Sequence, residues 1–343
     1  MDVGSARAAA RHWVTTTGRT RPGYLGAYLV GSTTALPDRA ELPLGSDVDV
    51  MLVTRQPLQG FKLGKFEHRG VLLEVSHLAW EQLGSVDAVL ADYHLAGGLR
   101  RDTVIDDPSG ALRGLQREVA ARFAEPDRVR LRCRGVRERI TTALTAADEA
   151  APWHDRVTGW LFPTGVTAHL VLVAALRNPT VRLRYLRARE ALGEFGLADR
   201  YPALLHLLGA DQLTPAQVRG HVDALAITFD AAARVAVTPF AFSTDITPPA
   251  RPIAVDASYE LVRRGDHREA MFWIIATFAR CHKILAADDP ATEAALAPLF
   301  DAAVADLGIT SDRDLRRHAG ATLDALPGLW DTAEQIIGAS ARI

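Results

Sequence analysis

Asp47 and Asp49 stand one residue apart at the start of an apolar run rich in β-branched residues. Side chains alternate between the two faces of a β-strand, so both carboxylates would point to the same side. Two carboxylates on one face repel each other unless a cation lies between them, and Mg²⁺ binds carboxylate and phosphate oxygens together. The spacing therefore predicts a site for a metal-bound nucleoside triphosphate.

A glycine–serine pair precedes the two aspartates and follows another strand-like run. Residues 24–30 (YLGAYLV) and 48–54 (VDVMLVT) have the composition of strands. Gly31 and Ser32 come directly after the first run, and a helix is expected to begin near Thr33. Glycine lets the backbone approach a phosphate closely, and the N–H groups at a helix start attract anions. The pair is therefore a candidate phosphate-binding turn.

A third carboxylate is expected on a neighbouring strand. Residues 65–76 have the pattern of a hairpin that turns near residues 69–70, and Glu74 lies among apolar residues in its second arm. As a strand residue it would reach the same edge as the two aspartates. Two other acids compete for this role, Glu67 near the turn and Glu81 in the helix expected to follow.

The order of these residues resembles the nucleotidyltransferase superfamily, which includes DNA polymerase beta and the antibiotic nucleotidyltransferases. The family pattern is Gly-Ser, a loop, Asp-x-Asp on the next strand and a third acid on a later strand. Gly31-Ser32, Asp47-Val48-Asp49 and Glu74 match it. The resemblance covers the first third of the chain, through residues 104–110, and is weak in the remainder. The loop before Asp47 is slightly longer than is common in the family.

The expected fold class is α+β, with two domains. An N-terminal nucleotidyltransferase domain, residues 1–125, would hold a mixed sheet flanked by helices. An all-α bundle that binds the acceptor would follow at 126–343, because strand patterns nearly vanish after Pro126 and proline disfavours helix at the residue before it. Helices are expected at 5–17, 79–93 (with a stop at 96–98), 111–123, 127–148, 153–177, 181–194, 202–208, 215–236, 257–264, 268–287, 291–307 and 311–338. A proline-rich connector is expected at 247–252.

The resemblance implies roles for the matching residues. Asp47, Asp49 and Glu74 would be catalytic and would bind two Mg²⁺ ions, while Gly31, Ser32 and Ser46 would hold the triphosphate. The implied reaction moves a nucleoside monophosphate from an NTP, such as ATP, to a hydroxyl of a small molecule and releases pyrophosphate. That acceptor would be an antibiotic or a natural-product intermediate. The alternatives are an RNA or protein acceptor, as in toxin–antitoxin enzymes, and a non-catalytic nucleotide-binding regulator.

The helical domain offers further candidates. In related enzymes a basic residue shortly after a proline-containing break reaches the nucleotide, and Arg182 and Arg184 follow Pro179 in this way. The alternative is an ordinary solvated helix start. Sequence does not choose a general base, which must lie within hydrogen-bond reach of the attacking hydroxyl. The candidates are Asp155, Glu190, Asp256, Glu260 and Glu269.

Composition narrows the partners and the location. The chain has 343 residues and a formal net charge of −2, which argues against nucleic acid or an anionic membrane as a partner. Two distant cysteines and the lack of an apolar leader predict a cytoplasmic protein with reduced thiols. The apolar helices are compatible with a homodimer or with a large core in a monomer.

Overall fold

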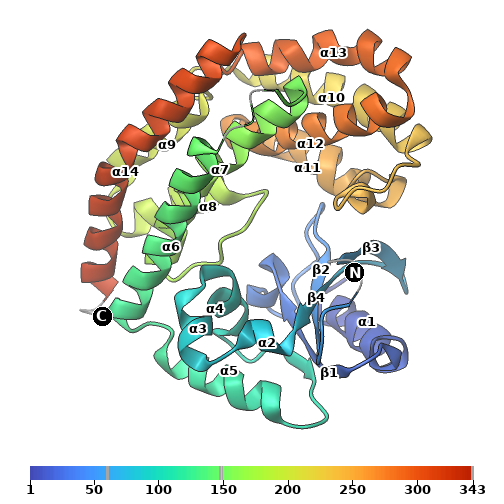
Figure 1. The fold of residues 1–343 in the computed structure, drawn as a ribbon, viewed down its shortest axis with the longest axis vertical. Coiled ribbons are helices and arrows are strands. Elements are labelled where there is room, and N and C mark those ends of the chain that lie inside the picture. Colours follow the sequence, from blue (N-terminus) through green and yellow to red (C-terminus); the bar gives the residue numbers. More distant parts are fainter. Residues whose placement is uncertain (59–61, 147, 149, 341–343) are drawn as a thin grey trace. The chain divides into compact units, whose positions relative to one another are not determined.

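A computed structural model describes residues 1–58, 62–146, 148 and 150–340. The chain forms two compact units, the first made of residues 1–132 and 241–253 and the second of residues 133–240 and 254–343. The first unit holds the sheet, and the second is helical (Figure 1). The predicted α+β class is therefore confirmed.

The sheet of the first unit has five strands in the order β3-β4-β2-β1-β5. Strands β2 and β4 are parallel, and the other neighbouring strands are antiparallel. The predicted hairpin is confirmed, because β3 and β4 pair around Arg69 and Gly70, both of which have positive φ angles. The strands are β1 (Tyr24–Val30), β2 (Val48–Thr54), β3 (Lys62–His68), β4 (Val71–Ala79) and β5 (Val104–Asp106).

Helices cover both faces of this sheet. Helix α1 (Val3–Thr16) packs Ala10, Trp13 and other apolar side chains on the face that carries Val50 and Leu52. Four short helices pack on the opposite face, around Val53 and its neighbours. They are α2 (Trp80–Leu83), α3 (Val86–Ala91), α4 (Tyr93–Leu99) and α5 (Ala111–Arg122). Asp49 points to the same face as Val53, but it lies four residues earlier in β2 and outside this apolar core.

The single helix predicted at 79–93 is wrong, since α2 and α3 occupy this region and α4 begins at its last residue. Gly84, with a φ of 54°, ends α2, and the Ser85 side chain accepts a hydrogen bond from the Ala88 N–H to cap α3. The Asp92 side chain caps α4 in the same way. Strong N-capping side chains in mid-run favour new helix starts over continuation. The expected stop at 96–98 lies inside α4.

The proline-rich segment predicted as a connector belongs to the first unit. It contains the 3₁₀ turn η5 (Pro248–Ala250), and together with the preceding turn η4 (Ser243–Asp245) it packs against the edge strand β3. Gly64 makes this contact possible, because a Cβ atom there would lie 2.3 Å from Thr244 Oγ1. The segment thus covers a strand edge that would otherwise expose unpaired backbone groups.

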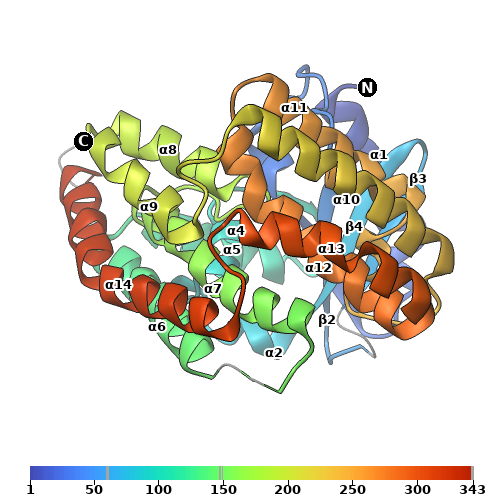
Figure 2. The same ribbon diagram turned by 90° about the horizontal axis from the view of Figure 1, so that it is seen from above.

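The second unit is built around two long buried helices, α7 (Trp153–Ala174) and α12 (His267–Asp288). Helix α7 packs against α12, α8 (Arg184–Glu194) and α14 (Asp312–Ser340) (Figure 2). Helix α12 packs against α10 (Pro215–Val235) and α13 (Pro290–Ala305). Among the described residues, α7 and α12 are long and apolar enough to cross a membrane, but 83% and 78% of their most apolar stretches are buried in the protein. Such burial is that of core helices in a globular unit.

The helices of this region follow the predicted ranges closely, with α8 beginning three residues later than expected. Residue 147, near the predicted end of the first of them, lies outside the described residues. The helices are α6 (Pro126–Thr145), which starts in the first unit, α7 (Trp153–Ala174), α8 (Arg184–Glu194), α9 (Tyr201–Leu208), α10 (Pro215–Val235), α11 (Ala257–Arg263), α12 (His267–Asp288), α13 (Pro290–Ala305) and α14 (Asp312–Ser340).

Candidate active site

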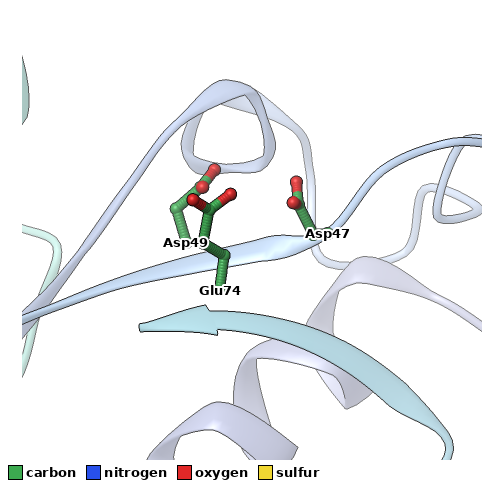
Figure 3. A group of neighbouring side chains, drawn as sticks. All are labelled: Asp47, Asp49 and Glu74. Atoms are coloured by element: carbon green, nitrogen blue, oxygen red, sulfur yellow. The ribbon is translucent and has the colours of Figure 1, made fainter. Parts of the chain in front are cut away.

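Strand register brings the acidic residues to one row of the sheet. Asp49 on β2 is the partner of Glu74 on β4, and Glu74 is the partner of Lys65 on β3. Residues paired in this way point to the same face, and Asp47 joins them because it precedes Asp49 by two positions. Figure 3 shows the three carboxylates projecting from the same side of the two strands.

The three carboxylates are close enough to share a cation. One oxygen from each of Asp47, Asp49 and Glu74 lies within 4.8 Å of the others, and all three residues are half-buried. Octahedral Mg²⁺ has ligands at about 2.1 Å, which places opposite ligands about 4.2 Å apart. At most one pair of the three oxygens can be opposite and the others would be adjacent, about 3.0 Å apart, so a bound divalent ion would draw these carboxylates closer together. Glu67 and Glu81, the competing acids, are both exposed and outside this group.

A lysine occupies part of the acidic cluster. Lys65 Nζ lies 2.8 Å from Asp47 Oδ2 and 3.0 Å from Asp245 Oδ1, and it also forms an ion pair with Glu74. Its side chain is only 8% exposed. Burial disfavours the charged ammonium, but the carboxylates of Asp47, Asp245 and Glu74 outweigh this effect and raise the pKa of Lys65.

Burial also acts on Asp47. It raises the pKa of this carboxyl group above its ordinary value, and the negative charge of Glu74 acts in the same direction. The ammonium of Lys65 opposes both effects. A cation beside Asp47 thus relieves an unfavourable concentration of negative charge.

Gly31 leaves the space that the Asp49 carboxylate occupies. Its φ of 78° and ψ of −170° belong to a region that only glycine adopts readily. A Cβ atom on Gly31 would lie 1.8 Å from Asp49 Oδ2. The glycine is therefore needed for the position of an acid as well as for close approach to a phosphate.

The loop after Gly31 is anchored from α1. Ser32 is exposed and begins η2 (Ser32–Ala35), a 3₁₀ turn instead of the predicted helix. The Arg7 guanidinium donates hydrogen bonds to the carbonyl oxygens of Thr33 and Leu36, at 2.5 and 2.9 Å. It also forms an ion pair with Asp38. Arg7 carries no sequence signal, because its partners lie 26 to 31 residues away.

Ser46 lies directly before Asp47 and is half-buried, and its N–H donates a hydrogen bond to the Pro43 carbonyl oxygen at 3.1 Å. It follows a tight turn at the end of the loop, which fixes the entry of the chain into β2. The role of Ser46 in binding a triphosphate stays a prediction.

Arg182 and Arg184 belong to the second unit. The Arg184 guanidinium is buried, lies 3.8 Å from the centre of the Phe272 ring and donates from Nε to the Val181 carbonyl oxygen. These contacts give Arg184 a packing role in the helical core. Arg182 is half-buried in the turn before α8. Contact of either arginine with a nucleotide stays a prediction.

The candidate general bases also lie in the second unit, and most are ion-paired there. The pairs are Asp155 with Lys283, Glu190 with Arg187, Glu260 with Arg263, and Glu269 with Arg189. The acid that the structure brings to the cluster is instead Asp245, which is 8% exposed. No motif or periodicity in the sequence identifies Asp245, because it belongs to a segment that is distant in sequence and packs against β3.

No protein-family model and no curated protein matches the chain. Among solved structures, the chain is similar to a nucleotidyltransferase-like protein from Exiguobacterium sibiricum 255-15, with 15% identity and a TM-score of 0.30. The match covers 57% of this chain and 65% of the other, so it spans less than two thirds of that protein. This degree of likeness carries no argument about fold or activity. Any function proposed for the chain therefore rests on the geometry of the acidic cluster.

Proposed function

We propose that this protein is a divalent-ion-dependent nucleotidyltransferase that moves a nucleoside monophosphate from an NTP to a hydroxyl of a small molecule. The observation that carries the proposal is the convergence of Asp47, Asp49 and Glu74 within 4.8 Å beside the positive-φ turn at Gly31. Three carboxylates close together on one face of a sheet are costly to assemble without a cation, and they match the ligand preference of Mg²⁺.

The acceptor class rests on charge. The net charge of −2 gives the chain no overall attraction for a polyanion such as RNA. A small hydroxylated compound, such as an aminoglycoside, a lincosamide or a natural-product intermediate, needs no such field. ATP and the other NTPs are all candidate donors.

The three carboxylates would hold the ion, and Gly31 leaves room for the Asp49 carboxylate to do so. A bound ion would neutralise phosphate charge and favour departure of pyrophosphate. In the reaction, the acceptor oxygen bonds to the α-phosphorus, the bond to the β-phosphate oxygen breaks, and the hydroxyl proton passes to a base or to water. The turn at Gly31 and Ser32, fixed by Arg7, would position the triphosphate, and positioning supplies much of the rate enhancement in such transfers.

A second candidate function is a nucleotide-binding regulator without catalysis. The ion pairs of Lys65 with Asp47 and Glu74 favour it, because they compensate two of the three carboxylates without a metal. Binding of nucleotide without release of pyrophosphate would distinguish this function from the first.

The test measures pyrophosphate release with Mg²⁺, each NTP in turn, and pooled aminoglycosides, lincosamides and nucleosides. We expect release with one NTP and one pool, and we expect Asp49→Asn to lower it at least a thousandfold while its circular dichroism is unchanged. Glu67→Gln is the matched control, because Glu67 is an exposed acid on strand β3 of the same sheet. Turnover by Asp49→Asn within a few fold of the wild type would refute the proposal.

A further inference from the structure

Lys65 is a charged side chain within the acidic cluster of Asp47, Asp49 and Glu74, and the proposed reaction assigns it no role. Its ammonium has three N–H donors, and three carboxylates surround it: Asp47, Glu74 and Asp245. The side chain is 8% exposed, so water does little to shield these charges. The ammonium is therefore placed as a bound cation would be.

This position conflicts with a full set of metal ions. Asp47 and Glu74 are two of the three carboxylates that would hold metal, and Lys65 contacts both. In two-metal sites the ions lie about 3.5–4 Å apart and share the carboxylates between them. An ammonium 2.8 Å from Asp47 Oδ2 lies where one such ion would bind and supplies one of its two positive charges.

The position of Lys65 is fixed from two sides. Its backbone is in register with Glu74 in the β3–β4 hairpin. From the other side, the 3₁₀ turn η4 presents Asp245, whose Oδ1 lies 3.0 Å from Nζ. Asp245 lies outside the group of converging oxygens that could hold a metal. Its contact at the site is with Lys65, and the absence of a side chain at Gly64 lets η4 lie against β3.

We propose that Lys65, held by Asp245, is a built-in cation that replaces one of two divalent ions, so that this chain binds a single ion on the Asp49 side of the cluster. The inference rests on the proposed function and changes its expected metal count from two to one. The charges agree with it. Four carboxylates and one ammonium leave three negative charges, which one divalent ion reduces to one, whereas two ions would make the cluster positive.

The experiment counts Mn²⁺ ions bound by the full chain, from the electron paramagnetic resonance signal of free Mn²⁺ during a titration. We expect one ion per wild-type chain. Lys65→Gln removes the charge but keeps hydrogen-bond donors, so we expect it to bind two ions and to bind the first at least tenfold more tightly. Lys65→Arg keeps the charge and is the matched control, with one ion expected. Circular dichroism checks that both variants are folded.

The wild-type count alone can overturn the inference, whatever the variants do: two ions per chain would mean that Lys65 displaces none. An unchanged count in folded Lys65→Gln would overturn it equally. Asp49→Asn separates this failure from that of the proposed function. If Asp49→Asn binds Mn²⁺ as the wild type does, or if the wild type binds none, the metal site itself is refuted and both proposals fall.

Discussion

Replacement of Gly31 by alanine tests how the site is built. The backbone at this position, with φ 78° and ψ −170°, costs a residue with a side chain about 1–3 kcal/mol. The added Cβ would lie 1.8 Å from Asp49 Oδ2 and 2.7 Å from Asp49 Cγ, so the carboxylate must move. Overpacking of this kind adds about 1–3 kcal/mol. We therefore expect Gly31→Ala to lower the free energy of unfolding by about 4 kcal/mol, midway in the summed range.

The assay is urea unfolding, combined with Mn²⁺ binding. Gly110→Ala is the matched control, because Gly110 also has a φ of 78° but has open space where a Cβ would be. It should cost about 1–2 kcal/mol, the usual penalty of a left-handed conformation. The contact with Asp49 is isolated by introducing Gly31→Ala into Asp49→Ala, where the added methyl group no longer meets a carboxylate. In that background we expect the cost to fall to the backbone penalty of about 1–3 kcal/mol.

Two results would refute this reasoning. One is a Gly31→Ala variant as stable as Gly110→Ala with Mn²⁺ binding unchanged, since the carboxylate would then not depend on the missing side chain. The other is strict additivity of Gly31→Ala and Asp49→Ala in unfolding free energy. Coupling is expected between residues in such direct contact.

Two further predictions concern Asp106 on β5 and Arg7 on α1. Asp106, which is 9% exposed, accepts hydrogen bonds from Arg19 and Tyr24, and the bond from Arg19 is the main cause that lowers the pKa of Asp106. Ionised Asp106 thus stabilises the fold above its unfolded pKa of about 3.9, and this stabilisation is lost as the pH falls through its lower folded pKa. We expect Asp106→Asn to lower the free energy of unfolding in urea by about 2 kcal/mol at pH 7. An equally large decrease at pH 2 would contradict this explanation. Arg7→Ala should release the loop after Gly31, because it removes the hydrogen bonds of Arg7 to the Thr33 and Leu36 carbonyl oxygens. We expect amide hydrogen exchange at residues 33–38 to become at least tenfold faster. Unchanged exchange there would show that Arg7 does not anchor the loop.

Local patterns in the sequence were sufficient for much of the first unit. Alternation and β-branched residues located β1, β2 and the hairpin, and they placed Asp47 and Asp49 on one face, because side-chain direction in a strand depends only on position along it. The helices after Pro126 followed from apolar periodicity, because the direction of a side chain in a helix also depends only on its position along the helix. The series α2–α4 was missed, because a capping side chain such as Asp92 outweighed a continuous apolar pattern.

Only the tertiary structure decided which other residues meet the two aspartates. The apolar neighbours of Glu74 favoured it over Glu67 and Glu81, but its place beside Asp49 depends on the parallel register of β4 against β2, which no local pattern encodes. Lys65 and Asp245 meet across 180 positions of the chain, through packing of η4 on an edge strand. The spacing of Asp47 and Asp49 in a strand therefore determined that acids would gather on one face of the sheet. Long-range contacts decided how many acids gather, which residues lie beside them and that Lys65 is among them, because such contacts depend on how distant segments pack.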